Sequence, residues 1–189
     1  MGIKRFKPTS SAIRKMVVMD SSELTKGVKP LRGLMVTRKD KAGRNNSGRI
    51  TVRRKGGGVK RKIRLVDFKR NKLDIPAKVQ AIVYDPNRTC NLAIIAYLDG
   101  TKNYILAPVG LSVGDTIIAS DSADIKSGNT KALKDVPIGT LVHNVELNPG
   151  AGGQLARSAG AYVQVMAKEG GDVLLRLPSG ELRNVKKEC

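Results

Sequence analysis

Apolar and polar residues alternate in short stretches through the last two-thirds of the chain. A period of two is typical of β-strands that bury one face. Two apolar stretches, residues 92–98 and 104–107, flank the polar turn at residues 99–102 (DGTK), which is a strong hairpin signal. Short strands at this spacing predict a small antiparallel barrel. The strands expected for it span residues 63–68, 79–85, 92–98, 104–107 and 116–119.

A second group of short strands follows a polar stretch at residues 120–137, which we interpret as a linker or long loop. Turns at 169–172 and 178–181 separate the last three of these strands. No segment has the sustained 3.6-residue period of a long amphipathic helix. We therefore predict an all-β fold with a second small barrel, built from residues 140–147, 161–167, 173–177 and 182–185.

The first 43 residues differ from the rest, because they are polar, basic and interrupted by Pro8, Gly27 and Pro30. Their apolar patches at 16–19 and 34–36 are too short to form a core. We expect this segment to be extended and ordered mainly by a partner. The predicted organisation is a basic N-terminal extension at 1–60, a first barrel at 61–128 and a second barrel at 129–189.

Charge is distributed very unevenly along the chain. The net charge is +19, and residues 1–78 hold 24 Lys and Arg against 5 acidic residues, whereas residues 79–189 hold 11 of each. A basic extension on a neutral body is typical of a protein bound to a polyanion. A membrane partner is not expected, because no apolar face accompanies the cations and no lipidation signal is present. We therefore expect nucleic acid as the polyanion.

The densest basic stretch lies at residues 44–72, where 12 of 29 residues are Lys or Arg and only Asp67 is acidic. Three consecutive glycines in its middle allow close approach of the backbone to a surface. The alternative is a solvated, flexible tail, but the run passes into a strand pattern from Ile63. The predicted RNA-binding residues of this stretch are Arg44, Arg49, Arg53, Arg54, Lys55, Gly56, Gly57, Gly58, Lys60, Arg61, Lys62, Arg64, Lys69 and Arg70.

A glycine-rich loop of 13 residues at 148–160 is the second candidate site. Its small residues permit close contact with a bulky partner, while its polar side chains offer hydrogen bonds; a simple connector is the alternative. The loop lacks the third glycine of a dinucleotide fingerprint and follows no βαβ pattern. The RNA-binding residues predicted here are Asn148, Gly150, Gly152, Gly153, Gln154, Arg157 and Ser158.

No catalytic or metal-binding constellation is apparent in the sequence. The single histidine, His143, lies in a strand-like segment without a Ser or Cys that pairs with it by pattern, and we expect a structural role. Cys90 and Cys189 have no ligand spacing around them, and the acidic residues are scattered. We predict neither enzymatic activity nor a metal, cofactor or small-molecule substrate.

Several segments together resemble ribosomal protein L2 of the large subunit, in its bacterial and organellar form. The resemblance covers the whole chain, and the glycine-rich loop is its most specific part. The segments that carry it are residues 43–51 (GRNNSGRIT), 54–58 (RKGGG), 60–62 (KRK), 67–70 (DFKR), 84–88 (YDPNR), 93–100, 143–150 (HNVELNPG), 154–160 (QLARSAG) and 177–181 (LPSGE).

This resemblance implies an OB-fold barrel followed by an SH3-like barrel, with a basic extension threaded into ribosomal RNA. It also implies a position near the peptidyl-transferase region, neighbouring ribosomal proteins, and roles in subunit assembly and subunit association. Arg88 and Arg157 match the family's RNA-contacting arginines. The expected location is an organellar matrix, with mitochondria favoured, or bacterial cytoplasm.

Two departures from the family pattern bear on these expectations. Family members carry histidines around the glycine triplet, where this chain has Lys55 and Val59, so phosphate contact is expected there rather than base-specific contact. Family members also continue past the position of Cys189 with a glycine-rich basic extension. We expect a separate polypeptide to supply that part, and the last strand of the second barrel to be shortened.

Three functional hypotheses follow. The first is a structural ribosomal protein, and the second is a translation or RNA-processing factor that binds transiently. The third, an RNA-directed enzyme, is supported by no motif. The structural protein recognises RNA by shape, backbone and 2′-OH. In the structural protein the first ~60 residues should be disordered when RNA is absent. A transiently bound factor should be folded without RNA. Protected amides throughout residues 1–43 would favour the factor.

Overall fold

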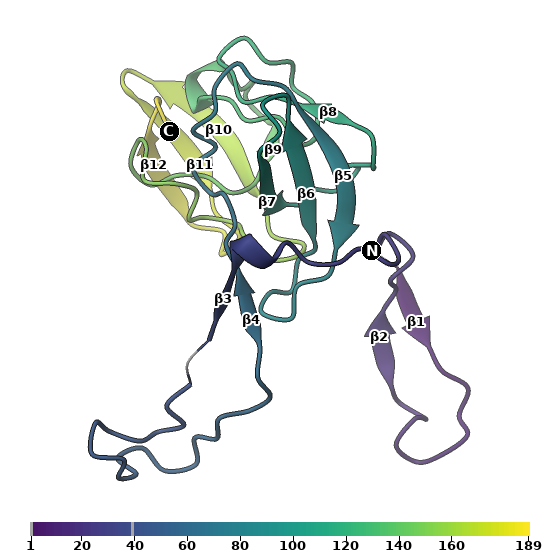
Figure 1. Cartoon of the computed structure of the whole chain (residues 1–189). Coiled ribbons are helices and arrows are strands. Elements are labelled where there is room, and N and C mark those ends of the chain that lie inside the picture. Colours follow the sequence, from purple (N-terminus) through teal and green to yellow (C-terminus); the bar gives the residue numbers. More distant parts are fainter. Residues whose placement is uncertain (1, 39) are drawn as a thin grey trace.

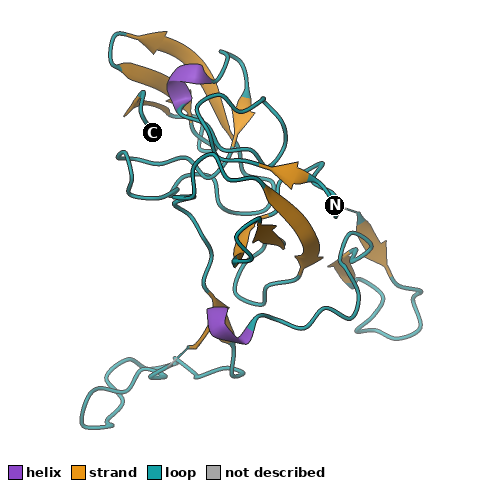
Figure 2. Cartoon of the chain, turned by 45° about the horizontal axis from the view of Figure 1, so that its top comes forward, coloured by secondary structure: helices purple, strands orange, loops and turns teal. Residues whose placement is uncertain are grey.

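The computed structural model describes residues 2–38 and 40–189, and these residues form an all-β protein. Figure 2 shows strands and long loops, with single-turn 3₁₀ helices η1 and η2 and no α-helix in the described ranges. None of the described segments forms a helix long and apolar enough to cross a membrane. Figure 1 shows a body of sheets from which two hairpins project. The hairpin elements are β1 (Ile3–Arg5) with β2 (Val17–Met19), and β3 (Met35–Thr37) with β4 (Lys62–Arg64); η1 spans Arg32–Leu34.

The first unit of the body is an antiparallel sheet with strand order β7-β6-β5-β8. Its β6–β7 pair is the hairpin expected from the sequence, with Ala96 opposite Lys102. The register of β5 against β6 shifts between Val79 and Ala81, where a bulge curves the sheet. The strands are β5 (Ala77–Val83), β6 (Leu92–Tyr97), β7 (Lys102–Leu106) and β8 (Thr116–Ile117).

Both faces of this first sheet are buried. Successive residues of β6 alternate between two hydrophobic clusters, with Ala93 and Ile95 in one and Leu92 and Ile94 in the other. This is why residues 92–97 are apolar without a break. The second cluster is covered from outside the sheet by Val66 and Phe68, by Ala159 of the glycine-rich loop, and by apolar residues of the N-terminal segment.

Part of the N-terminal segment packs on the barrel, a contact that the sequence analysis did not predict. Val28, Leu31 and Leu34 pack against the second cluster. The Leu31 N–H donates to the hydroxyl of the fully buried Tyr104 at 2.8 Å, and a buried phenol needs such a partner. The Thr25 N–H donates to the Ile82 carbonyl at 2.9 Å, and the Ile82 N–H donates to the Thr25 hydroxyl at 3.1 Å. The segment therefore contributes to the core.

We predict a divided amide-exchange pattern for the free protein. The Thr25 and Leu31 amides are expected to be protected because they hydrogen-bond to the barrel, whereas amides in the exposed loop at residues 53–60 are expected to exchange at close to the unprotected rate. Hydrogen exchange monitored by NMR in the absence of RNA measures this. Equal exchange in the two segments would contradict the packing described here.

The second unit is a sheet with strand order β12-β11-β10-β9. The predicted strand at 140–147 is strand only at β9, and β12 pairs with β11 over its whole length. The predicted linker also contributes to this core, because Leu133 and Val136 are buried in it. The elements are η2 (Leu133–Asp135), β9 (Leu141–Val142), β10 (Val163–Glu169), β11 (Asp172–Arg176) and β12 (Leu182–Lys186).

Candidate nucleic-acid interface

The loop of the β3–β4 hairpin extends away from the body (Figure 1). Every residue from Arg44 to Lys62 is exposed. Among the described residues, none of the basic side chains in this range lies within ion-pairing distance of a carboxylate. Exposed cations without a carboxylate partner attract a polyanion, because no ion pair within the protein has to be broken first.

The backbone conformation requires glycine at Gly43. It does not require glycine at every position of the triplet at residues 56–58. Gly43 has φ +74°, and a Cβ there would lie 2.4 Å from the Val52 carbonyl oxygen. The Gly43 carbonyl accepts the N–H groups of Thr51 and Val52, which closes a small loop inside the hairpin. In the triplet only Gly58 has positive φ, and no atom crowds it. The triplet is therefore free of internal packing and open to an external surface.

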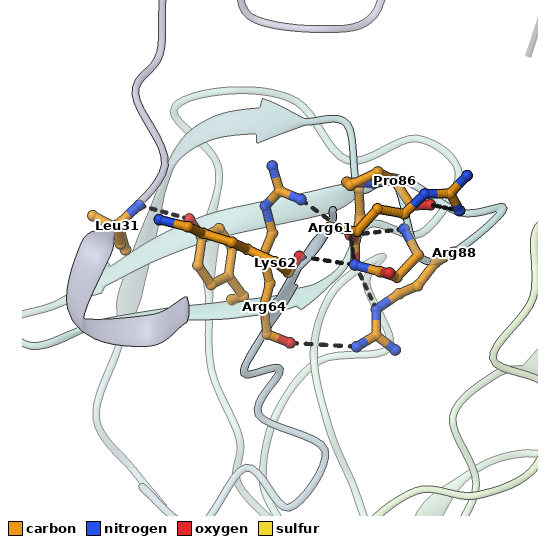
Figure 3. Close-up of polar contacts among 9 residues, drawn as sticks. Leu31, Arg61, Lys62, Arg64, Pro86 and Arg88 are labelled. Carbon is orange, nitrogen blue, oxygen red and sulfur yellow. Dashed lines mark hydrogen bonds and ion pairs between the residues drawn. The ribbon is translucent and has the colours of Figure 1, made fainter. Parts of the chain in front are cut away.

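A buried carboxylate ties the base of this hairpin to the barrel. Asp85 is fully buried. Its Oδ1 accepts from Arg64 Nη1 at 3.0 Å and from the Asn87 N–H at 3.1 Å, and its Oδ2 accepts from Arg88 Nε at 2.8 Å. Bonds to two cations satisfy the carboxylate, which would otherwise be costly to bury. Figure 3 shows these side chains around the turn at residues 85–88.

Further bonds join β4 to the same turn. The Asn87 amide donates to the Lys62 carbonyl at 2.8 Å, and Arg61 Nη1 donates to the Pro86 carbonyl at 3.1 Å (Figure 3). Arg88 Nη2 donates to the Arg64 carbonyl at 3.4 Å. The cation-bearing strand is thus held by side chains from a turn about 25 residues away. This fixes the direction in which the hairpin leaves the body.

The two arginines expected from the family resemblance meet on one aromatic ring. The Arg157 guanidinium lies 4.7 Å from the Phe68 ring centre, and that of Arg88 lies 5.5 Å from it. A guanidinium over a ring keeps donors free for another acceptor. The Arg157 carbonyl accepts from Cys90 Sγ at 3.2 Å, which holds the glycine-rich loop beside the first barrel. Two barrels therefore contribute one cation each to the same surface.

The glycine-rich loop packs on the chain's own segment at residues 67–70, and this changes the role of three predicted contact residues. Gly152 and Gly153 are buried, and the Gly153 N–H donates to the Phe68 carbonyl at 2.9 Å. The N–H groups of Gly150 and Gly152 donate to the Glu146 carboxylate at 2.9 and 2.7 Å. Arg70 is also buried, with 6% of its surface exposed. Burial weighs against direct RNA contact by Arg70, Gly152 and Gly153.

We predict that Gly153→Ala destabilises the fold by about 1–3 kcal/mol, the range for overpacking a close contact. A Cβ at this position would lie 2.2 Å from Asn144 Oδ1 and 2.4 Å from the Asn144 carbonyl oxygen. Urea denaturation measures the change. Gly171→Ala is the matched control, because nothing lies within 4 Å of its Cβ position and its φ is not in the left-handed range. Equal stabilities of the two variants would contradict the close packing.

Arg70 and His143 form a polar region where the two barrels meet. Burial lowers the pKa of Arg70, and it raises the pKa of the adjacent Tyr97. The pKa of His143 is lowered, mainly because the surrounding protein disfavours the imidazolium and secondly because the Arg70 cation is close. Arg70 Nε, Tyr97 Oη and Asn144 Oδ1 lack hydrogen-bond partners among the described residues. The lowered pKa favours the neutral imidazole, although His143 is an exposed residue, and the structural role expected for it stays a prediction.

The remaining predicted contact residues form two groups. The first group lies on the β3–β4 hairpin. Within it, Arg61, Lys62 and Arg64 lie at the base of the hairpin beside Arg88, and the predicted residues from Arg44 to Lys60 lie along its exposed loop. The second is the exposed part of the glycine-rich loop, comprising Asn148, Gly150, Gln154, Arg157 and Ser158, with Lys69 close by.

Sequence reasoning missed Asp85, Asn87 and Phe68 as organising residues. The local signal for two of them was the Asp85-Pro86-Asn87-Arg88 turn, in which an acid and a cation lie three residues apart.

An all-β body of two small barrels with a projecting cationic hairpin defines a class of RNA-binding proteins, those that are built into ribonucleoprotein particles. Residues 31–119 match the family described as Ribosomal Proteins L2, RNA binding N-terminal domain, and residues 126–189 match Ribosomal Proteins L2, C-terminal domain. The chain belongs to the ribosomal protein L2 family.

This membership confirms the family expected from the sequence, and the all-β fold agrees with its OB-fold and SH3-like barrels. The chain is therefore a ribosomal protein of the large subunit that binds ribosomal RNA. The family is one of structural ribosomal proteins and not of enzymes.

Proposed function

We propose that this protein holds ribosomal RNA near the peptidyl-transferase region and supports large-subunit assembly, subunit association and translation. The observation that carries the proposal is the exposed cationic hairpin anchored at a buried carboxylate. Its cations enter places where RNA helices crowd together and reduce the repulsion between them. Because each neutralised phosphate releases counterions, binding should weaken steeply with salt.

The proposed contact surface has two parts. The exposed loop of the hairpin contacts phosphates without reading sequence, since its cations have no carboxylate partner among the described residues. The second part is the Arg88–Phe68–Arg157 group, in which the Arg88 guanidinium is paired with Asp85 and both guanidinium groups lie over the Phe68 ring. Two neighbouring guanidinium groups suit recognition of the RNA backbone. Contact residues, domain boundaries, an organellar location and a separate C-terminal polypeptide stay predictions.

Site-specific photocrosslinking in assembled large subunits tests the proposal. A photoreactive residue at Arg49 or Gln154, both exposed, should crosslink to large-subunit RNA, and the products should map to the neighbourhood of the peptidyl-transferase region. The same residue at Asp124, which is exposed on the first barrel and paired with Lys126, serves as the comparison. Recovery of crosslinks only to proteins, or loss of the chain from particles after a mild salt wash, would contradict the proposal.

A further inference from the structure

Tyr84 is an exposed aromatic residue in a chain with four tyrosines, two phenylalanines and no tryptophan. Tyr97 and Tyr104 are buried, whereas Tyr84 is 54% exposed and Tyr162 is 56% exposed. Tyr84 immediately follows β5 and immediately precedes Asp85, the carboxylate that anchors the cationic hairpin. The fold thus places a free phenol ring beside the proposed RNA surface.

Tyr84 lines two hollows that also share Leu24. The first has a volume of about 370 Å³ and is further lined by Met19, Asp20, Ser21 and Asn91. The second, of about 300 Å³, contains Arg64 in its wall. Hydrogen bonds between Thr25 and Ile82 hold the N-terminal wall of both hollows against the barrel. The hollows are therefore formed between segments of the chain that hydrogen-bond to each other.

The chemistry of the first hollow suits a nucleobase better than a phosphate. Met19 and Leu24 supply apolar contacts, and the phenol ring supplies a surface for stacking. The Asn91 side-chain amide lines the hollow and offers a donor and an acceptor. The Asp20 carboxylate, whose Oδ1 accepts from the Ser22 N–H at 3.2 Å, repels phosphate and retains lone pairs suited to base amino and imino donors. Such edges are available only on unpaired bases of RNA.

A cation for a flanking phosphate lies near Tyr84 in the sequence and the fold. Arg61 is exposed and is fixed to the Pro86 carbonyl two residues after Tyr84. Arg64 lines the second hollow, with its guanidinium paired to Asp85. An RNA strand whose phosphate contacts Arg61 can place one base on Tyr84 in the first hollow.

We propose that the hollow beside Tyr84 binds one unpaired nucleobase of ribosomal RNA, stacked on the phenol ring with its edge facing Asp20 and Asn91. This rests on the proposed RNA-binding function. It adds a stacking contact to recognition that otherwise depends on charge and shape.

The test compares Tyr84→Ala, Tyr84→Phe and the matched control Tyr162→Ala for binding to a large-subunit RNA transcript across a salt series. Tyr84→Ala should weaken binding about 5- to 100-fold, the range for loss of one stacked base. It should leave the salt dependence unchanged, because no phosphate contact is removed. Tyr84→Phe keeps the ring and should bind within about 3-fold of wild type, and Tyr162→Ala should bind as wild type does. Urea denaturation checks that the variants are folded.

Chemical probing of the transcript gives a second readout. One unpaired base should be protected by the wild-type protein and become reactive with Tyr84→Ala. If the wild-type chain fails to bind the transcript, the proposed function itself fails. If it binds and Tyr84→Ala binds equally well, the nucleobase site is overturned. A further outcome is that Tyr84→Ala binds the transcript as wild type does but is lost from particles. That result would assign the hollow to a neighbouring protein and would also overturn the nucleobase site.

Discussion

Asp85→Ala is expected to lower the free energy of unfolding by about 3–5 kcal/mol, which is the usual cost of removing one partner from a buried ion pair. Asp85 is fully buried and accepts hydrogen bonds from two arginines and from the backbone of the following turn. Its removal leaves the guanidinium groups of Arg64 and Arg88 partly buried without a counterion. Urea denaturation followed by circular dichroism measures the loss.

Asp124→Ala is the control for this prediction. The Asp124–Lys126 pair has a similar separation, 2.9 Å, but both side chains are about three-quarters exposed. Exposed pairs contribute about 0–1 kcal/mol, so this variant should unfold nearly as wild type does. If Asp85→Ala does not fold, Asp85→Asn keeps the shape and one acceptor oxygen and gives a measurable partial loss. Equal effects at Asp85 and Asp124 would contradict the anchoring role of Asp85.

Replacement of five hairpin cations by glutamine is expected to weaken RNA binding strongly without changing stability. Arg49, Arg53, Arg54, Lys55 and Lys60 are exposed, and no ion pair involves them in the described part of the chain. If each contacts one phosphate, the slope of log affinity against log salt should become shallower by about 3.5 to 4.5. Filter binding of a large-subunit RNA transcript at several salt concentrations measures the slope.

A set of five exposed cations on the second barrel provides the comparison, namely Lys168, Arg176, Arg183, Lys186 and Lys187. Their replacement by glutamine removes the same formal charge, so long-range attraction changes equally in the two variants. Only the hairpin variant should show a large change in slope, because only the hairpin is proposed to lie among phosphates. Identical slopes in the two variants would show that total charge, and not the hairpin, determines binding.

Much of the fold was predictable because its signals are local. Two apolar stretches on either side of the turn at 99–102 identified the β6–β7 hairpin, and the turn at residues 85–88 followed from its Asp-Pro-Asn composition. The uneven charge identified the hairpin that projects from the body. Strand lengths were less accurate, since the strand expected at 140–147 contains only Leu141 and Val142 as strand.

The site was predictable in composition but not in its internal arrangement. The basic stretch and the glycine-rich loop were identified, yet the sequence could not show that the loop folds back on Phe68 and Lys69. Gly152, Gly153 and Arg70 are therefore buried between segments of the protein. Val28, Leu31 and Leu34 were also misjudged, because their burial depends on a barrel face formed by residues about 60 to 70 positions further along the chain.

The sequence alone determined the strand periodicity, the charge asymmetry and the family, since each depends on neighbouring residues or on motifs of fixed spacing. Only the tertiary structure decided which polar groups meet. It brings Arg64 and Arg88 to one carboxylate at Asp85, and it brings Arg88 and Arg157, one from each barrel, to the Phe68 ring. The physical reason is that buried charges and orphan polar atoms must find partners wherever closure of the barrels places them, and that closure depends on contacts between distant parts of the chain.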